Sequence, residues 1–253
     1  MQIDKKKLER QLIGVHRWFN SLTYGALFDR QGTLNYFTGV GKTYTAILII
    51  KRLFREDSLH NIVVIVPSEF LQKQWLEVLG LNFTKAKLNR IEVFTAHWVV
   101  NNKVKIRTNT LIADELHEYL GEEFFNVIDS TYIQFDNSLG LTATYEDSKG
   151  RHKNLKLHFP IVDKIPEDEA IKEGYISPYV EFNIEVELNE KERADYETYS
   201  TIISKNINKF GRNGLDLATK CLGGGKHSNG KRYEGKHFVY GWAGHNGWHK
   251  NLN

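Results

Sequence analysis

A regular alternation of short β-type runs with helical stretches, over about the first 200 residues, limits the possible fold more than any other property of this chain. Strands that alternate with helices in this way are typical of a parallel sheet with helical crossover connections. Two of the runs, residues 61–66 and 109–113, are largely apolar without alternation, as expected for strands covered on both faces. The pattern therefore predicts an α/β fold, a parallel sheet flanked by helices.

Individual elements can be placed from the same pattern. The strand candidates are residues 33–37, 61–66, 90–94, 109–113 and 133–141, and the helix candidates are residues 4–19, 43–55, 69–79 and 116–128. Ser68 is the expected N-cap of the third helix, and Gly80 is its expected end. After Thr144 a charged loop leads to an alternating strand, residues 179–188, and a helix over about 189–209. We expect a domain over residues 1–178 and an extension with a tail over residues 179–253.

The segment 36–43, YFTGVGKT, lies between a predicted strand and a predicted helix. Glycines there let successive backbone N–H groups converge on phosphate oxygens, and the positive end of the following helix adds to the attraction. Lys42 is long enough to reach the β- and γ-phosphates, and the Thr43 hydroxyl can ligate Mg²⁺. The residues predicted to bind nucleotide are Thr38, Gly39, Val40, Gly41, Lys42 and Thr43. Tyr36 stands where the usual motif has Gly or Ala, and a bulky ring there is expected to narrow the pocket.

An apolar strand ends in two carboxylates, Asp114 and Glu115, 72 positions after Lys42. In a parallel sheet this end lies at the same edge as the phosphate loop. Asp114 is expected to hold Mg²⁺ through its hydration shell, and Glu115 to orient and deprotonate an attacking water. His117 is a further catalytic candidate, although a histidine at a helix start is often only a surface residue.

Together these residues resemble the superfamily-two helicases and translocases, whose first RecA-like domain carries a G-x-G-K-T loop and a D-E-x-H tetrad. Residues 66–75 resemble the family's motif Ia, residues 93–96 its motif Ib and residues 141–144 its motif III. The resemblance implies nucleic-acid contacts, coupling residues and an adenine-reading pair. The implied nucleic-acid contacts are Pro67, Ser68, Gln74 and Thr95, and the implied coupling residues are Thr142 and Thr144. The implied adenine-reading pair is Arg10 with Gln11, for which a plain surface helix is an equal alternative.

The resemblance extends more loosely to about residue 210, where residues 173–178 and the segment after them look like phage and nucleotide-excision-type members. It implies ATP and Mg²⁺ as cofactors and nucleic acid as partner, with DNA favoured over RNA. Only 109 residues follow Thr144, fewer than the roughly 150 of a full domain. We therefore expect the second RecA-like lobe, which supplies an arginine to the γ-phosphate, to be absent from this chain and ATP hydrolysis by it to be slow.

The end of the chain differs in composition from the rest. Residues 204–253 hold nine Lys and Arg against two acidic residues, and ten of the twenty glycines, in a chain of net charge +3. Such a tail can follow a phosphate backbone by charge attraction. A solvated end without a partner is an equally good interpretation. A zinc site at Cys221 and the nearby histidines is weakly supported, because paired cysteines are missing.

These observations favour the ATP-binding lobe of a nucleic-acid-dependent ATPase, a DNA helicase or translocase. A non-catalytic, nucleotide-dependent subunit of a nucleoprotein assembly is the alternative, and another phosphate-loop enzyme such as a nucleotide kinase is a third. The longest apolar run, residues 62–66, is far shorter than the ~20 residues of a membrane span. We expect no membrane contact and a cytoplasmic location, in the host cytoplasm if the protein is phage-encoded.

Overall fold

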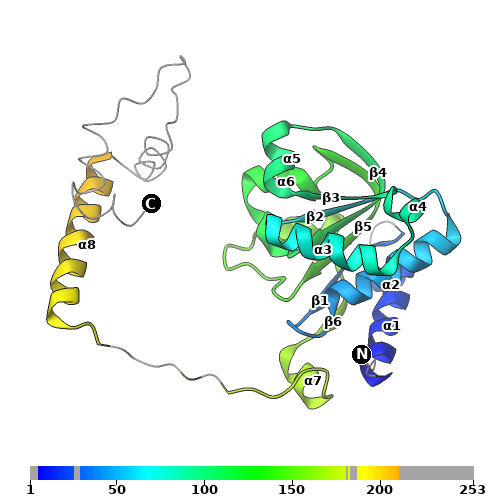
Figure 1. The fold of residues 1–253 in the computed structure, drawn as a ribbon, viewed down its shortest axis with the longest axis horizontal. Coiled ribbons are helices and arrows are strands. Elements are labelled where there is room, and N and C mark those ends of the chain that lie inside the picture. The colour runs from blue at the N-terminus through cyan, green and yellow to red at the C-terminus, as the bar shows by residue number, and fades with distance from the viewer. Residues whose placement is uncertain (1–4, 26–28, 181, 183–186, 211–253) are drawn as a thin grey trace. The chain divides into compact units, whose positions relative to one another are not determined.

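The computed structural model describes residues 5–25, 29–180, 182 and 187–210. The chain divides into two units, residues 1–179 and 180–253. The first unit is an α/β domain whose six strands are all parallel, in the order β3-β2-β4-β5-β1-β6 (Figure 1). The strands are β1 (Gln31–Tyr36), β2 (Ile62–Val66), β3 (Ile91–Thr95), β4 (Ile106–Asp114), β5 (Ile133–Thr142) and β6 (Ile161–Ile165). The predicted parallel α/β fold is confirmed.

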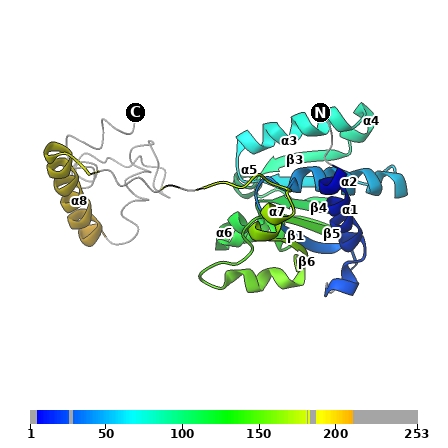
Figure 2. The same cartoon turned by 90° about the horizontal axis from the view of Figure 1, so that it is seen from below.

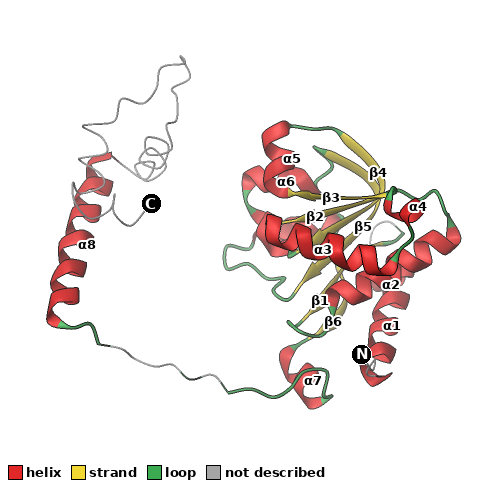
Figure 3. Cartoon of the chain, in the orientation of Figure 1, coloured by secondary structure: helices red, strands yellow, loops and turns green. Residues whose placement is uncertain are grey.

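Helices cover both faces of the sheet (Figure 3). They are α1 (Lys5–Phe19), η1 (Ser21–Tyr24), α2 (Lys42–Glu56), α3 (Glu69–Asn82), α4 (Lys85–Leu88), α5 (Ala96–Asn102), η2 (Leu116–Leu120), α6 (Glu122–Ile128), η3 (Arg151–Leu157) and α7 (Glu167–Lys172). The second unit contains α8 (Glu190–Phe210). None of the helices in the described part of the chain is long and apolar enough to cross a membrane.

Two hydrophobic cores explain why the central strands lack alternation. Side chains of a strand point to opposite faces in turn, and in β2 every side chain is buried. Ile62, Val64 and Val66 pack with α1, α2 and α3, whereas Val63 and Ile65 pack with α5, α6 and η2. Each face of the sheet is therefore apolar, and the carboxyl ends of the strands remain as the place for polar groups.

Several predicted boundaries are wrong. α3 does not stop at Gly80 but continues to Asn82, and Ser68 caps its start as predicted. The predicted helix over residues 116–128 is split into η2 and α6, which Gly121 separates, and the left-handed Glu115, at φ 49°, precedes η2. The described residues of the predicted strand 179–188 are not in a strand, and its other residues, like the tail with Cys221, lie outside the described part.

Six of the elements in the described residues have no counterpart in the sequence prediction: η1, α4, α5, η3, β6 and α7. β6 pairs with β1 at the edge of the sheet, and α7 follows it at the end where β1 and β6 terminate (Figures 1 and 2). A left-handed Gly174, at φ +73°, ends α7 and turns the chain back, with the Tyr175 N–H donating to the Ala170 carbonyl. The edge strand thus brings residues 161–176 beside α1.

The packing of α1 against β1 leaves no room for a side chain at Gly14. A Cβ there would lie 1.8 Å from the Tyr36 hydroxyl oxygen, whereas at Gly80, also inside a helix, it would meet nothing within 4 Å. Alanine stabilises a helix interior by about 0.5–1 kcal/mol over glycine. We expect Gly80→Ala to gain about that amount in urea denaturation and Gly14→Ala to lose about 1–3 kcal/mol from overpacking. A Gly14→Ala protein as stable as the wild type would contradict the close packing.

Candidate functional site

The loop between β1 and α2 has the backbone shape of an anion-binding loop. Gly39 and Gly41 adopt φ of +84° and +101°, conformations that side chains strongly disfavour. α2 begins at Lys42, and no side chain hydrogen-bonds to cap its first turn. The first N–H groups of a helix lack partners within the helix and favour a negative charge. The loop and the start of α2 can therefore receive a phosphate group.

Two side chains of α1 hold this loop in place. Lys7 Nζ donates to the Gly39 carbonyl at 2.7 Å, and Gln11 Nε2 donates to the Val40 carbonyl at 2.9 Å. Gln11 is 4% exposed. A Cβ on Gly41 would lie 2.4 Å from the Gln11 amide nitrogen. The structure thus places Gln11, the candidate adenine-reading residue, against the phosphate loop and adds Lys7, which was not predicted from the sequence.

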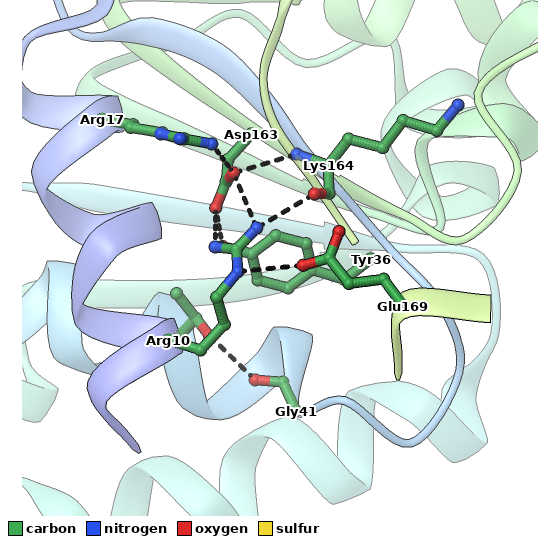
Figure 4. A network of polar contacts seen from close by, with 8 residues as sticks. Arg10, Arg17, Tyr36, Gly41, Asp163, Lys164 and Glu169 are labelled. Carbon is green, nitrogen blue, oxygen red and sulfur yellow. Dashed lines mark hydrogen bonds and ion pairs between the residues drawn. The ribbon is translucent and has the colours of Figure 1, made fainter. Parts of the chain in front are cut away.

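Arg10 points toward Asp163 and not toward the phosphate loop (Figure 4). Its guanidinium donates to both carboxylate oxygens of Asp163 on β6, at 2.6 and 3.0 Å, and to the Lys164 carbonyl at 3.0 Å. Its Nε lies 3.4 Å from Glu169 Oε1. The sequence resemblance predicts Arg10, together with Gln11, as a nucleotide-binding residue, but the structure does not bring Arg10 to the loop. The reason is a buried acid on a strand that the sequence analysis did not predict.

Tyr36 does not narrow the pocket. The residue is fully buried, and its hydroxyl donates to Asp163 at 2.5 Å, between β1 and β6 (Figure 4). Burial, together with the Asp163 charge, raises the pKa of Tyr36 well above its ordinary value, so the side chain stays a neutral donor. The expectation of a ring that crowds the phosphate loop is wrong, because the side chain points into the domain core.

The phosphate loop and the acidic pair meet at one end of the sheet. Lys42 Nζ lies 3.9 Å from Glu115 Oε1 and 3.4 Å from the Tyr36 carbonyl oxygen. Thr43 and Asp114, the two predicted Mg²⁺ ligands, line one hollow of about 340 Å³. Lys42 and Thr43 of the phosphate loop therefore lie beside the acidic pair, Asp114 and Glu115, at this end of the sheet.

Asp114 is held firmly in this site. It is 5% exposed, its Oδ2 accepts from Trp75 Nε1 at 2.7 Å, and its Oδ1 accepts from the Glu115 N–H at 3.1 Å. Burial raises the pKa of Asp114, and the Glu115 charge adds to this, while the Trp75 hydrogen bond opposes it. A hydroxyl and a carboxylate on one hollow are oxygen donors of the kind that Mg²⁺ prefers. The residues present therefore fit this ion.

The buried carboxylate of Asp114 should lower the stability of the fold. A raised folded-state pKa means that folding favours the protonated acid, a contribution that is lost as the pH rises through that pKa. Asp114→Asn removes the charge, so we expect a higher melting temperature at neutral pH in buffer with EDTA, by about 2–4 °C per kcal/mol gained. This gain should disappear as the pH is lowered through the pKa of Asp114. Lower stability at neutral pH would contradict the assignment.

His117 connects the acidic pair to the end of β5. Its Nδ1 lies 3.0 Å from the Thr142 hydroxyl and 3.6 Å from Glu115 Oε2. The Thr142 hydroxyl in turn donates to the Thr144 carbonyl at 2.9 Å and accepts from the Thr144 N–H at 3.1 Å. A displacement of Glu115 can therefore reach residues 142–144 through one imidazole ring.

The predicted nucleic-acid contacts fall into two groups. Ser68 and Thr95 both cap helices, accepting from the Leu71 N–H at 3.3 Å and the Trp98 N–H at 3.2 Å. Val66 pairs with Thr95 in register, so Pro67, Ser68 and Thr95 lie at the same carboxyl edge of β2 and β3. Gln74 lies apart from them and lines the hollow with Thr43. Three of the four candidates therefore share one edge.

Comparisons with known proteins give a family match and several similar structures. Residues 6–105 match the family model described as "Type III restriction enzyme, res subunit". Among solved structures, a nuclease-deletion mutant of the Type ISP restriction-modification enzyme LlaGI, bound to a DNA substrate mimic, matches 84% of this chain and 23% of its own, with 14% identity and a TM-score of 0.53. No curated protein matches the sequence.

Two helicase structures are also similar. The Hef helicase domain of Pyrococcus furiosus has 19% identity and a TM-score of 0.48, with 83% of this chain and 48% of its own covered. The UvsW helicase of Bacteriophage T4 has 19% identity and a TM-score of 0.43, with 57% and 58% covered. This chain spans less than two thirds of the length of each of these structures.

The all-parallel sheet and the similarity to the LlaGI structure show that the first unit has a RecA-like α/β fold. Within this fold the phosphate loop follows β1 and the acidic pair follows β4.

Proposed function

We propose that this chain is the ATP-binding lobe of a nucleic-acid-dependent ATPase that acts as a DNA helicase or translocase. The observation that supports it most directly is the convergence of the phosphate loop with the acidic pair, where Lys42 and Glu115 approach to 3.9 Å and Thr43 and Asp114 line one hollow. The similarity to the LlaGI structure, which is bound to a DNA substrate mimic, favours DNA over RNA.

Each residue of the site has a role in hydrolysis of the γ-phosphate. The amides of residues 38–41 and the start of α2 bind the phosphates, and Lys42 neutralises charge on the β- and γ-oxygens. Glu115 orients an attacking water and takes its proton. When bound at Thr43 and Asp114, Mg²⁺ supplies further positive charge to the phosphate oxygens. Gln11 stands beside the loop, where it can meet the base of the nucleotide.

The remaining candidate residues couple ATP hydrolysis to the nucleic acid. Pro67, Ser68 and Thr95 contact the nucleic-acid backbone, and His117 with residues 142–144 transmits the nucleotide state. A second RecA-like lobe or an assembly partner supplies an arginine to the γ-phosphate. The protein acts in the cytoplasm, in that of the host if it is phage-encoded. The alternative is a non-catalytic nucleotide-dependent subunit of a nucleoprotein assembly.

Nucleotide affinity tests the proposal. Wild-type protein should bind ATP with Mg²⁺, and Lys42→Ala should bind it far more weakly, as calorimetry can show. Lys51→Ala is a matched control on the same helix, because Lys51 Nζ donates to Asn82 Oδ1, away from the loop. ATP hydrolysis with and without single-stranded DNA, at two salt concentrations, then tests coupling. Equal weak binding by wild type and Lys42→Ala would overturn the proposal in favour of the non-catalytic subunit.

A further inference from the structure

Trp75 occupies an unusual position for a core residue. It lies two turns into α3, is 2% exposed, and packs in the core that α3 shares with the sheet. Its indole N–H does not meet a backbone carbonyl but donates to Asp114 Oδ2 at 2.7 Å. Trp75 and Asp114 also line the same hollow as Thr43. One side chain of a covering helix therefore contacts the carboxylate proposed to hold Mg²⁺.

The hydrogen bond restricts the direction of the Asp114 carboxylate. Its other oxygen accepts from the Glu115 N–H, on the same chain segment, so Trp75 is the partner that comes from another layer of the domain. An indole ring that fills a packed core has little freedom to rotate. Groups that hydrogen-bond to metal ligands orient them, and their loss typically reduces metal affinity about 10–100-fold.

We infer that Trp75 is a positioning residue, which orients the Asp114 carboxylate for Mg²⁺ bound with the nucleotide. This inference rests on the proposed function, since it assigns a role toward the same ion. It predicts an effect that depends on Mg²⁺, whereas a residue that only fills the core would affect nucleotide binding with and without the ion alike.

The chain offers a matched control for the test. Trp18 is also fully buried, and its indole N–H donates to the Ser138 carbonyl at 2.8 Å, on β5 rather than at the acidic pair. Trp18→Phe and Trp75→Phe each delete one buried indole N–H and keep an aromatic ring. The measurement is the affinity for ADP with Mg²⁺ and for ADP with EDTA, by calorimetry, alongside urea denaturation.

Trp75→Phe should weaken ADP binding about tenfold with Mg²⁺ and leave it unchanged with EDTA. Trp18→Phe should lose a comparable amount of stability without changing the ratio of the two affinities. If Trp75→Phe changes both affinities equally, or neither, the inference is overturned. No ADP binding by wild type under either condition would instead overturn the proposed function, so the two failures are distinguishable.

If Trp75→Phe does not fold, the wild-type protein answers the same question by NMR. The Trp75 indole N–H signal can be identified by its shift in Asp114→Asn. Addition of Mg²⁺ to the ADP-bound wild type should shift this signal and leave the Trp18 indole signal in place. An unchanged Trp75 signal in the presence of bound Mg²⁺ and ADP would overturn the inference.

Discussion

Replacing Glu115 by Gln is expected to lower kcat for ATP hydrolysis by about 10²–10⁴-fold, the usual contribution of a general base. Gln keeps the size and polarity of the side chain but cannot take a proton from water. Lys42, Thr43 and Asp114 keep their positions, so the affinity for Mg²⁺ and ATP should stay close to the wild-type value. Steady-state hydrolysis, stimulated by single-stranded DNA, and calorimetric binding measure the two quantities separately.

Glu118 provides the control for this substitution. It lies in η2, three residues after Glu115, is exposed, and contacts His117 Nε2 at 3.4 Å rather than Lys42. Glu118→Gln should therefore change kcat little. A Glu115→Gln protein that hydrolyses ATP at the wild-type rate would exclude Glu115 as the base. A parallel loss of nucleotide affinity would indicate instead that Glu115 acts mainly on the position of Lys42, from which its Oε1 lies 3.9 Å away.

The parts of the site that were predicted from the sequence are those with a local signature. A glycine loop between a strand and a helix, or a pair of acids at the end of an apolar strand, needs only neighbouring residues to be recognised. Once the parallel sheet was predicted, both signatures had to lie at its carboxyl edge, because crossover connections fix that edge. The structure places Lys42 and Glu115 together there.

The parts that were not predicted depend on contacts between distant segments. The sequence of β6 is IVDKI. Because two of its five residues are charged, a buried strand cannot be recognised there unless the partner of Asp163 is known. That partner is Arg10, 153 positions earlier. Because the contact with Asp163 was not known, Arg10 was predicted to bind the nucleotide and Tyr36 was predicted to narrow the phosphate pocket. The predicted end of α3 at Gly80 is wrong for another reason. On an open helix surface glycine costs only about 1 kcal/mol relative to alanine, so the helix can continue through it.

Asp163 is the point where these distant contacts meet (Figure 4). The carboxylate is 2% exposed and accepts hydrogen bonds from Arg10, Arg17, Tyr36 and the Lys164 N–H. These donors come from α1, β1 and β6, so one buried acid joins three elements. α1 is also the helix whose Lys7 and Gln11 hold the phosphate loop. Asp163 is therefore connected to the phosphate loop through α1.

Asp163→Ala is expected to destabilise the protein by about 3–5 kcal/mol, because it leaves the largely buried Arg10 guanidinium without the carboxylate that accepts two of its hydrogen bonds. Since the free energy of unfolding of a domain is about 5–15 kcal/mol, urea denaturation should show a much lower midpoint. Nucleotide affinity should fall as well, as α1 loses its attachment. Asp147→Ala is the control: Asp147 also accepts two guanidinium hydrogen bonds, from Arg151, but on the surface, and should cost far less. Equal losses in the two variants would show that burial does not raise the contribution of Asp163 above that of a surface ion pair.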